Sequence, residues 1–144
     1  MEKQKVDMFI GMNAENFTPQ DLMIIKEKLE KMEDGSIFAS GDFTKRDVYD
    51  LNFTSDSEIT ALRIEALPDD RLPGKGPGRA FYEGRIGTFF LSEVTALTKG
   101  SAIQFLKPTS HGGNGGENTA DGDGSSGWNS GDNGIEHHLV LPLK

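Results

Sequence analysis

The chain has 144 residues, a formal net charge of -8 at pH 7, 18 glycines and no cysteine. Its length suits one domain, or one domain plus part of another. The missing cysteines exclude disulfides, zinc–thiolate sites, iron–sulfur clusters and covalently attached haem. The acidic balance argues against a general nucleic-acid binder, which needs Lys and Arg to contact phosphates. No run approaches the 18 or so apolar residues of a membrane span, and we find no signal peptide.

The segment 19–32 carries two competing patterns. Thr18 followed by Pro19 is typical of a helix N-cap with proline at the first helical position. Apolar residues then recur at helical spacing, at Leu22, Ile25, Leu29 and Met32. The alternative is a short strand over 23–25 and a second over 28–32 that enters the turn "EDGS".

From residue 34 onward the patterns are those of β-strands. Asp34-Gly35 is a hairpin dipeptide, and "VYDLNF" at 48–53 alternates as a half-buried strand does. Further expected strands are "SIFAS", "ITALRIEAL", a run over about 88–97, "AIQFLKP" and "IEHHLVLPLK". Short strands separated by turns predict an antiparallel β-sandwich.

The stretch 109–134 is rich in Gly, Ser, Asn and Asp, which is the composition of a linker or a very long loop. Trp128 argues against a free linker, because an indole needs apolar neighbours. It is either a hydrophobic plug or a platform on which a sugar stacks. Because "DGSIFASGD" resembles "DGSSGWNSGD", a second copy of a module starting near residue 100 stays open.

The predicted domain organisation has three parts. Residues 1–20 are an N-terminal extension, and 21–99 form the β-sandwich module. Residues 100–144 are a Gly-rich loop plus a strand, with the start of a second similar module as the alternative reading.

The stretches "ITALRIEALPD", "LPGKGPGR" and "FFLSEV", in this order after "DGSIFASG", resemble a β-rich region of large exported planctomycete-type cytochrome-c-like multidomain proteins. "ADGDGSSGW" followed by "HHLVLPL" is similar to a "DG…W" element of that region, and also to discoidin-type and galactose-binding-like modules. The resemblance covers roughly residues 30–143, and the "LPD…LPGKGPGR" loop is its most specific part. It implies a jelly-roll-like sandwich and, by analogy, carbohydrate or surface binding. The haem-binding Cys-x-x-Cys-His motif is absent, so neither haem nor electron transfer carries over.

The connection 67–85 is long, rich in proline and glycine, and basic within an acidic chain. Prolines fix φ and glycines permit tight turns, so the loop can hold one shape. One hypothesis is a rim that binds an anionic or hydroxyl-rich ligand through guanidinium donors, with Tyr82 or Phe81 as a stacking platform. The predicted ligand-binding residues are Arg71, Lys75, Arg79, Tyr82 and Arg85. The alternative is a structural loop whose arginines pair with Asp69, Asp70 or Glu93.

Two sets of carboxylates are candidates for a calcium site. Asp121 and Asp123 stand two residues apart in "DGDG" and supply oxygen ligands on one tight loop; the alternative is an acidic turn. Glu65 and Glu93, expected at adjacent strand positions, are the second candidate. His137 and His138 are strand neighbours, so their side chains point to opposite faces and cannot hold one metal ion.

These patterns together predict an all-β, jelly-roll-like antiparallel sandwich, with one short N-terminal helix as an open alternative. We expect no enzyme, because no catalytic arrangement is marked. The predicted function is a non-catalytic module that binds carbohydrate or a cell-surface polymer, extracellular or periplasmic, within a longer exported chain. Its partners would be a glycan or surface polymer and other domains of the parent protein, with calcium as the candidate cofactor. The alternative is a structural or protein–protein interaction module with no small-molecule ligand.

Overall fold

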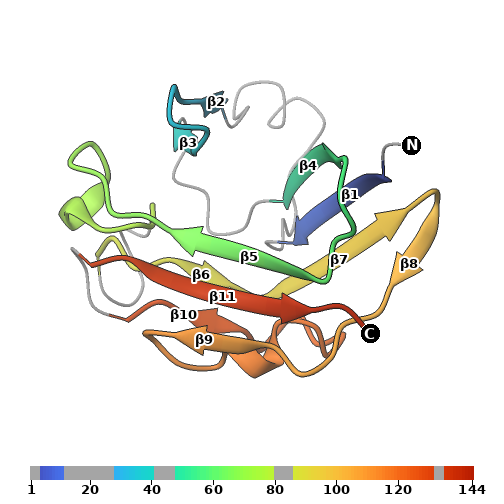
Figure 1. Ribbon diagram of the computed structural model, residues 1–144. Coiled ribbons are helices and arrows are strands. Elements are labelled where there is room, and N and C mark those ends of the chain that lie inside the picture. Colours follow the sequence, from blue (N-terminus) through green and yellow to red (C-terminus); the bar gives the residue numbers. More distant parts are fainter. Residues whose placement is uncertain (1–3, 12–27, 41–47, 80–85, 132–134) are drawn as a thin grey trace, which may run out of the picture.

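A computed structural model describes residues 4–11, 28–40, 48–79, 86–131 and 135–144. Within them the regular elements are antiparallel strands and two single-turn 3-10 helices, η1 (Pro73–Lys75) and η2 (Gly116–Asn118) (Figure 1). The prediction of an all-β antiparallel fold is confirmed, whereas the jelly-roll connectivity stays a prediction.

The largest sheet has the strand order β4-β1-β7-β8. Its strands are β4 (Val48–Ser55), β1 (Gln4–Gly11), β7 (Glu93–Thr98) and β8 (Ser101–Ile103). Exposed and half-buried residues alternate along β4, so the half-buried strand expected over 48–53 is confirmed. Lys99 and Gly100, with φ of 50° and 79°, connect β7 to β8, and two positive φ values in a two-residue connection are typical of a type I′ hairpin.

A second sheet has the order β5-β11-β9. It consists of β5 (Ala61–Ala66), β11 (His137–Pro142) and β9 (Thr109–His111), and a short pair joins β6 (Phe90–Leu91) to β10 (Trp128–Asn129). In β11, His137, Leu139 and Leu141 are buried and the residues between them are half-buried. This alternation gives the sheet one inner face and one outer face.

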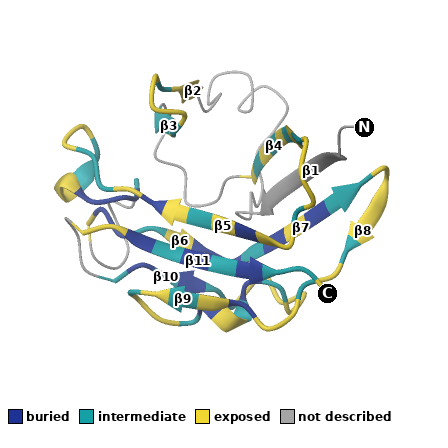
Figure 2. Ribbon diagram, viewed as in Figure 1, coloured by how far each residue is buried: buried dark blue, intermediate teal, exposed yellow. Residues whose placement is uncertain are grey.

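The two sheets share one apolar core (Figure 2). Its buried members are Leu62, Ala66, Leu91, Val94, Ala96, Trp128, Leu139 and Leu141. Trp128 is fully buried, its indole Nε1 donates a hydrogen bond to the carbonyl of Gly112 (3.0 Å), and the Phe89 ring meets it edge-on at 6.0 Å. The hydrophobic-plug interpretation of Trp128 is confirmed, because a ring with no exposed surface cannot stack on a sugar.

Strands that follow residue 100 pair with strands that precede it. His137 of β11 lies opposite Ala66 of β5, and Trp128 of β10 lies opposite Leu91 of β6. The predicted module boundaries stay an expectation from the sequence. The structure adds that the described part of 101–144 contributes four paired strands, β8 to β11, and part of the same core. Figure 1 shows one such pairing, between the neighbouring β5 and β11.

A separate hairpin is formed by β2 (Lys28–Lys31) and β3 (Ile37–Ser40). The helical interpretation of 19–32 is wrong over 28–31, and residues 19–27 lie outside the described ranges. The strand alternative is confirmed there: Gly35, at φ 86°, lies in the turn, and Met32 donates a backbone hydrogen bond to the carbonyl of Ser36 (2.8 Å). Cross-strand hydrogen bonds override the local helical periodicity.

Candidate functional site

The basic loop begins where β5 ends and is described as far as Arg79. Its backbone closes on itself: the N–H of Asp69 donates to the carbonyl of Gly76 (3.3 Å), and that of Leu72 donates to the carbonyl of Asp69 (3.0 Å). Pro73 stands in the first turn of η1, where a backbone N–H is not needed. The loop therefore has a compact shape that its own backbone fixes.

Two glycines let this loop lie directly against the segment 86–88. A Cβ atom on Gly78 would overlap the carbonyl group of Thr88, and one on Gly87 would overlap the carbonyl oxygen of Pro73. The N–H of Gly78 donates to the carbonyl of Gly87 (2.8 Å), and Gly87 has a φ of 80°. Backbone approaches backbone here, which only residues without a side chain allow.

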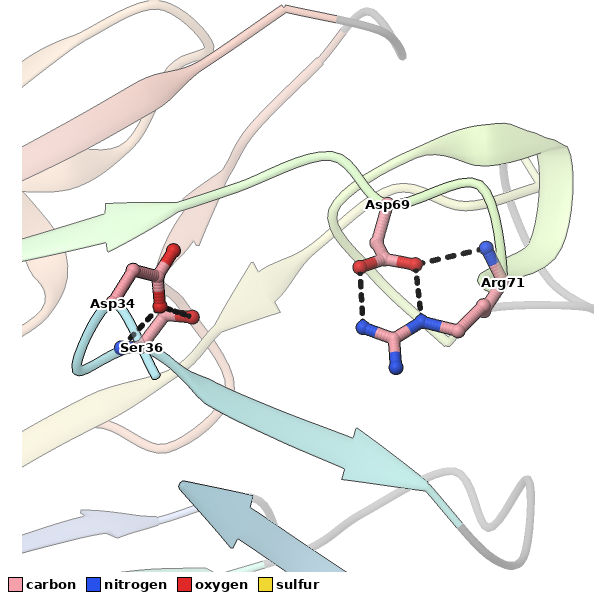
Figure 3. Close-up of polar contacts among 4 residues, drawn as sticks. All are labelled: Asp34, Ser36, Asp69 and Arg71. Carbon is pink, nitrogen blue, oxygen red and sulfur yellow. Dashed lines mark hydrogen bonds and ion pairs between the residues drawn. The ribbon is translucent and has the colours of Figure 1, made fainter. Parts of the chain in front are cut away.

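Arg71 is bound to Asp69 by both ends of the carboxylate (Figure 3). Its Nε donates to Oδ1 (2.8 Å), its Nη2 donates to Oδ2 (2.7 Å), and its backbone N–H also donates to Oδ1 (2.9 Å). The side-chain and then the backbone hydrogen bonds from Arg71 lower the pKa of Asp69 to about 2. This is a fork-to-carboxylate pair, the geometry in which a guanidinium recognises an acid.

The same guanidinium connects the loop to the β2–β3 hairpin. The Cζ of Arg71 lies 3.8 Å from the centre of the Phe38 ring, within cation–π range. The side-chain hydrogen bond to Asp69 raises the pKa of Arg71, and the charge of Glu30 on β2 adds a smaller rise. Arg71 therefore holds two chain segments together, and no sequence pattern marked Phe38 as its neighbour.

The other predicted ligand-binding residues have different surroundings. Lys75 is exposed and its Nζ lies 3.7 Å from Asp70 Oδ1, a distance at which a surface pair contributes little. Arg79 Nη2 donates to the hydroxyl of Tyr49 on β4 (3.3 Å). Tyr82 and Arg85 lie outside the described residues, so their place in a ligand site stays a prediction. The pair between Arg71 and Asp69 is one of those that the structural alternative named.

Asp121 and Asp123 lie in an exposed turn before β10. Asp121 Oδ1 accepts a hydrogen bond from the N–H of Asp123 (2.8 Å), and Asp123 Oδ1 accepts from the hydroxyl and the N–H of Ser125 (2.6 and 2.9 Å). These bonds from Ser125 lower the pKa of Asp123. Such contacts are typical of Asx turns. In the described part of the chain no three His, Asp or Glu side chains are arranged to hold a metal ion; calcium at this turn stays a prediction.

Glu93, at the start of β7, reaches the same turn. Its Oε1 accepts a long hydrogen bond from the N–H of Gly122 (3.4 Å), and its Oε2 is buried without a hydrogen-bond partner among the described residues. Burial raises the pKa of Glu93, and the charges of Asp121 and Asp123 raise it further. The sequence did not indicate this approach of a third carboxylate.

The prediction that Glu65 and Glu93 stand at adjacent strand positions is wrong. Glu65 belongs to β5 in the β5-β11-β9 sheet, whereas Glu93 belongs to β7 in the other sheet. Glu65 Oε1 instead pairs with Nε of Arg63 (2.7 Å) on its own strand. The chain passes from β5 to β7 by crossing between sheets, which strand alternation alone does not reveal.

The structure brings His111 and His138, which are far apart in the sequence, next to each other. His111 of β9 lies opposite His138 of β11, and their rings stack with centroids 5.1 Å apart and planes 16° apart. His137 is buried on the other face, against Gly112. The opposite orientation expected for His137 and His138 is confirmed. The pairing of β9 with β11 was the missing information, because strands this short carry little alternation of their own.

In the described part of the chain, no helix has the length and apolar character of a membrane span. No family model matches this chain, and neither a curated protein nor a solved structure matches it significantly. The resemblance to the β-rich region of exported cytochrome-c-like proteins therefore stays a prediction.

Proposed function

We propose that this chain is a non-catalytic β-sandwich module that binds another protein surface, and that its basic loop is an internal clamp rather than a ligand rim. The observation that carries this proposal is the position of Arg71. Its fork of donors is occupied by Asp69, and its flat face is covered by Phe38. The Arg71 side chain is 51% exposed, but a sugar or sulfate that needed the same two donors, Nε and Nη2, would have to displace Asp69.

Exposed apolar residues beside the clamp support a protein partner. Leu67 follows β5 and Ile135 precedes β11, two strands that pair at this end of the sandwich. Ile86 precedes Gly87, which contacts Pro73 of the loop. The exposed fractions of Leu67, Ile86 and Ile135 are 37%, 48% and 56%. We call these three residues the apolar end; apolar groups gathered at one end of a domain are typical of interaction sites.

The partner that fits the apolar end is a folded protein surface or a neighbouring domain with an apolar patch of its own. Glycan sites instead present hydrogen-bond donors and an open aromatic ring, and the described arginines of the loop already have partners in the chain. The function predicted first from the sequence, carbohydrate binding, is therefore the competing outcome of the test.

The test is site-specific photo-crosslinking in the native organism, with a photoreactive residue at Ile135. The matched control position is Leu106, which is similarly exposed (51%) and lies after β8. We expect a discrete protein adduct from position 135 only. The adduct must be identified and its affinity measured with the purified partner, and Leu67→Glu must weaken that binding while Leu106→Glu leaves it unchanged.

A glycan array with the folded chain, with and without calcium, completes the test. If the wild-type chain binds a glycan on the array and the double variant Arg71→Ala/Arg79→Ala does not, the proposal is overturned in favour of a carbohydrate site at the loop. Absence of a protein adduct at Ile135 would also count against the proposal.

A further inference from the structure

The outer face of the β5-β11-β9 sheet carries a row of side chains that the proposed function does not use. The register places Glu65 of β5, His138 of β11 and His111 of β9 across from one another. None of these three residues is buried, whereas the next residue of β11, Leu139, points into the core. The row therefore faces outward, on the side of the sheet away from the core.

The two imidazoles of this row are already neighbours. Their centroids are 5.1 Å apart and their planes are nearly parallel. Directly opposed residues in antiparallel strands have Cβ atoms about 4.5–5.5 Å apart, so the ladder fixes both points of attachment. A divalent ion bonds imidazole nitrogen at about 2.0–2.1 Å, so its two ligating nitrogens lie at most about 4 Å apart. Rotation about the side-chain bonds brings two stacked rings within this span.

The carboxylate of the row is engaged elsewhere. Glu65 Oε1 pairs with Nε of Arg63 (2.7 Å), and Nη2 of Arg63 also lies 3.7 Å from Glu136 Oε1. This agrees with the absence of any three-residue metal cluster among the described residues. An ion held here would take two protein ligands and complete its coordination with water.

We propose that His111 and His138 form a two-imidazole site for a divalent transition-metal ion. Imidazole favours copper, nickel and zinc over the hard ions calcium and magnesium, and the usual order of affinities places Cu²⁺ above Ni²⁺ and Zn²⁺. The site uses none of the residues of the apolar end or of the Asp121–Asp123 turn. Metal bound here would cross-link β9 to β11 and so stabilise the edge of the sheet.

The experiment is an isothermal calorimetric titration of the tag-free chain with Cu²⁺, Ni²⁺, Zn²⁺ and Ca²⁺. The test variants are His111→Gln and His138→Gln. The matched control is Thr109→Gln, on the same exposed edge strand but leaving both imidazoles in place. Circular dichroism melts of the metal-free proteins verify that each variant folds.

We expect one Cu²⁺ per chain and no calcium response at this site. Loss of either imidazole should weaken Cu²⁺ binding about tenfold or more, since even the loss of a group that only hydrogen-bonds to a metal ligand has an effect of this size. Thr109→Gln should bind Cu²⁺ as the wild type does. Electron paramagnetic resonance of the Cu²⁺ complex should show two coupled nitrogens in wild type and fewer in each histidine variant. Wild-type affinity in either histidine variant, or no Cu²⁺ binding at micromolar protein, would overturn the proposal.

Discussion

The sandwich core and the loop–hairpin region are held together by different forces. Around Trp128 the contacts are apolar and fully buried, and two sheets contribute to them. Around Arg71 the contacts are an exposed ion pair, a ring contact and close backbone packing. Buried apolar area dominates folding free energy, whereas exposed charge pairs contribute little. The loop–hairpin region should therefore be the more easily opened of the two.

The largest effect is expected from the core. Trp128→Ala removes a fully buried indole and should lower the free energy of unfolding by about 3–5 kcal/mol. Urea denaturation followed by far-ultraviolet circular dichroism measures it. The exposed control Leu106→Ala should stay within about 0.5 kcal/mol of the wild type; equal effects of the two substitutions would contradict this description of the core.

The close packing of the loop can be separated from simple glycine strain. Gly87 and Gly122 have nearly the same φ, 80° and 82°, but only Gly87 has backbone atoms where a Cβ would stand. Gly122→Ala should cost about 1–2 kcal/mol from the left-handed backbone, and Gly87→Ala should cost about 1–3 kcal/mol more from overlap. Thermal melts of the two variants compare them, and similar losses would mean that the loop yields easily.

The Arg71 contacts should be needed for the hairpin but not for the core. Arg71→Ala removes the link to Phe38 and should speed amide hydrogen exchange in β3 while leaving β11 unchanged. Lys75→Ala, which removes a neighbouring exposed charge, is the control. Unchanged exchange in β3 after loss of Arg71 would show that the hairpin is held by other contacts.

Acid should weaken the ion pair between Asp69 and Arg71. The pKa of Asp69 is about 2 in the folded chain against an ordinary 3.8, so ionised Asp69 contributes a stability increment that is complete above pH 3.8. The increment disappears as the pH falls through about 2. Because Asp69 is near the surface, the increment should be small. In Asp69→Asn the free energy of unfolding should fall less steeply between pH 3.8 and about 2 than in the wild type. An equally steep fall in both proteins would contradict the assigned pKa.

Glu93 should show the opposite pH dependence, with a small effect. Burial and the neighbouring aspartates raise its pKa in the folded chain, so the folded state binds the proton more tightly than the unfolded state does. This contribution is favourable below the ordinary pKa of 4.5 and is lost as the pH rises through the raised value. Measured against the wild type, Glu93→Gln should therefore be more favourable to stability at pH 7 than at pH 4. The exposed control Glu117→Gln should show less of this difference. A calcium-dependent shift in the melting temperature that Glu93→Gln or Asp121→Asn abolishes would instead assign this turn to metal binding.

The fold class could be predicted because alternation and turn residues are local signals. The hairpin turn at Asp34-Gly35, the alternation in β4 and the need of Trp128 for apolar neighbours all follow from the residues themselves. The helical pattern before the hairpin was misleading over 28–31, since helical spacing in a short segment competes poorly with a strand partner.

The candidate site could be predicted only in part. The loop was marked by its prolines, glycines and charges, and Asp69 was named as a partner for its arginines in the structural alternative. Phe38, Tyr49 and the 86–88 segment were not, because these contacts join separate parts of the chain. The approach of Glu93 to Asp121 and Asp123 was missed for the same reason.

The sequence by itself determined that this chain forms antiparallel strands, where several of its turns lie, and that its long loop is rich in glycine, proline and positive charge. Only the tertiary structure decided which strands pair, and therefore that Arg71 contacts Phe38 and that His111 stacks on His138. Strand and turn preferences depend on residues close in sequence. Pairing depends on which distant segments bury one common core, and no local pattern specifies it.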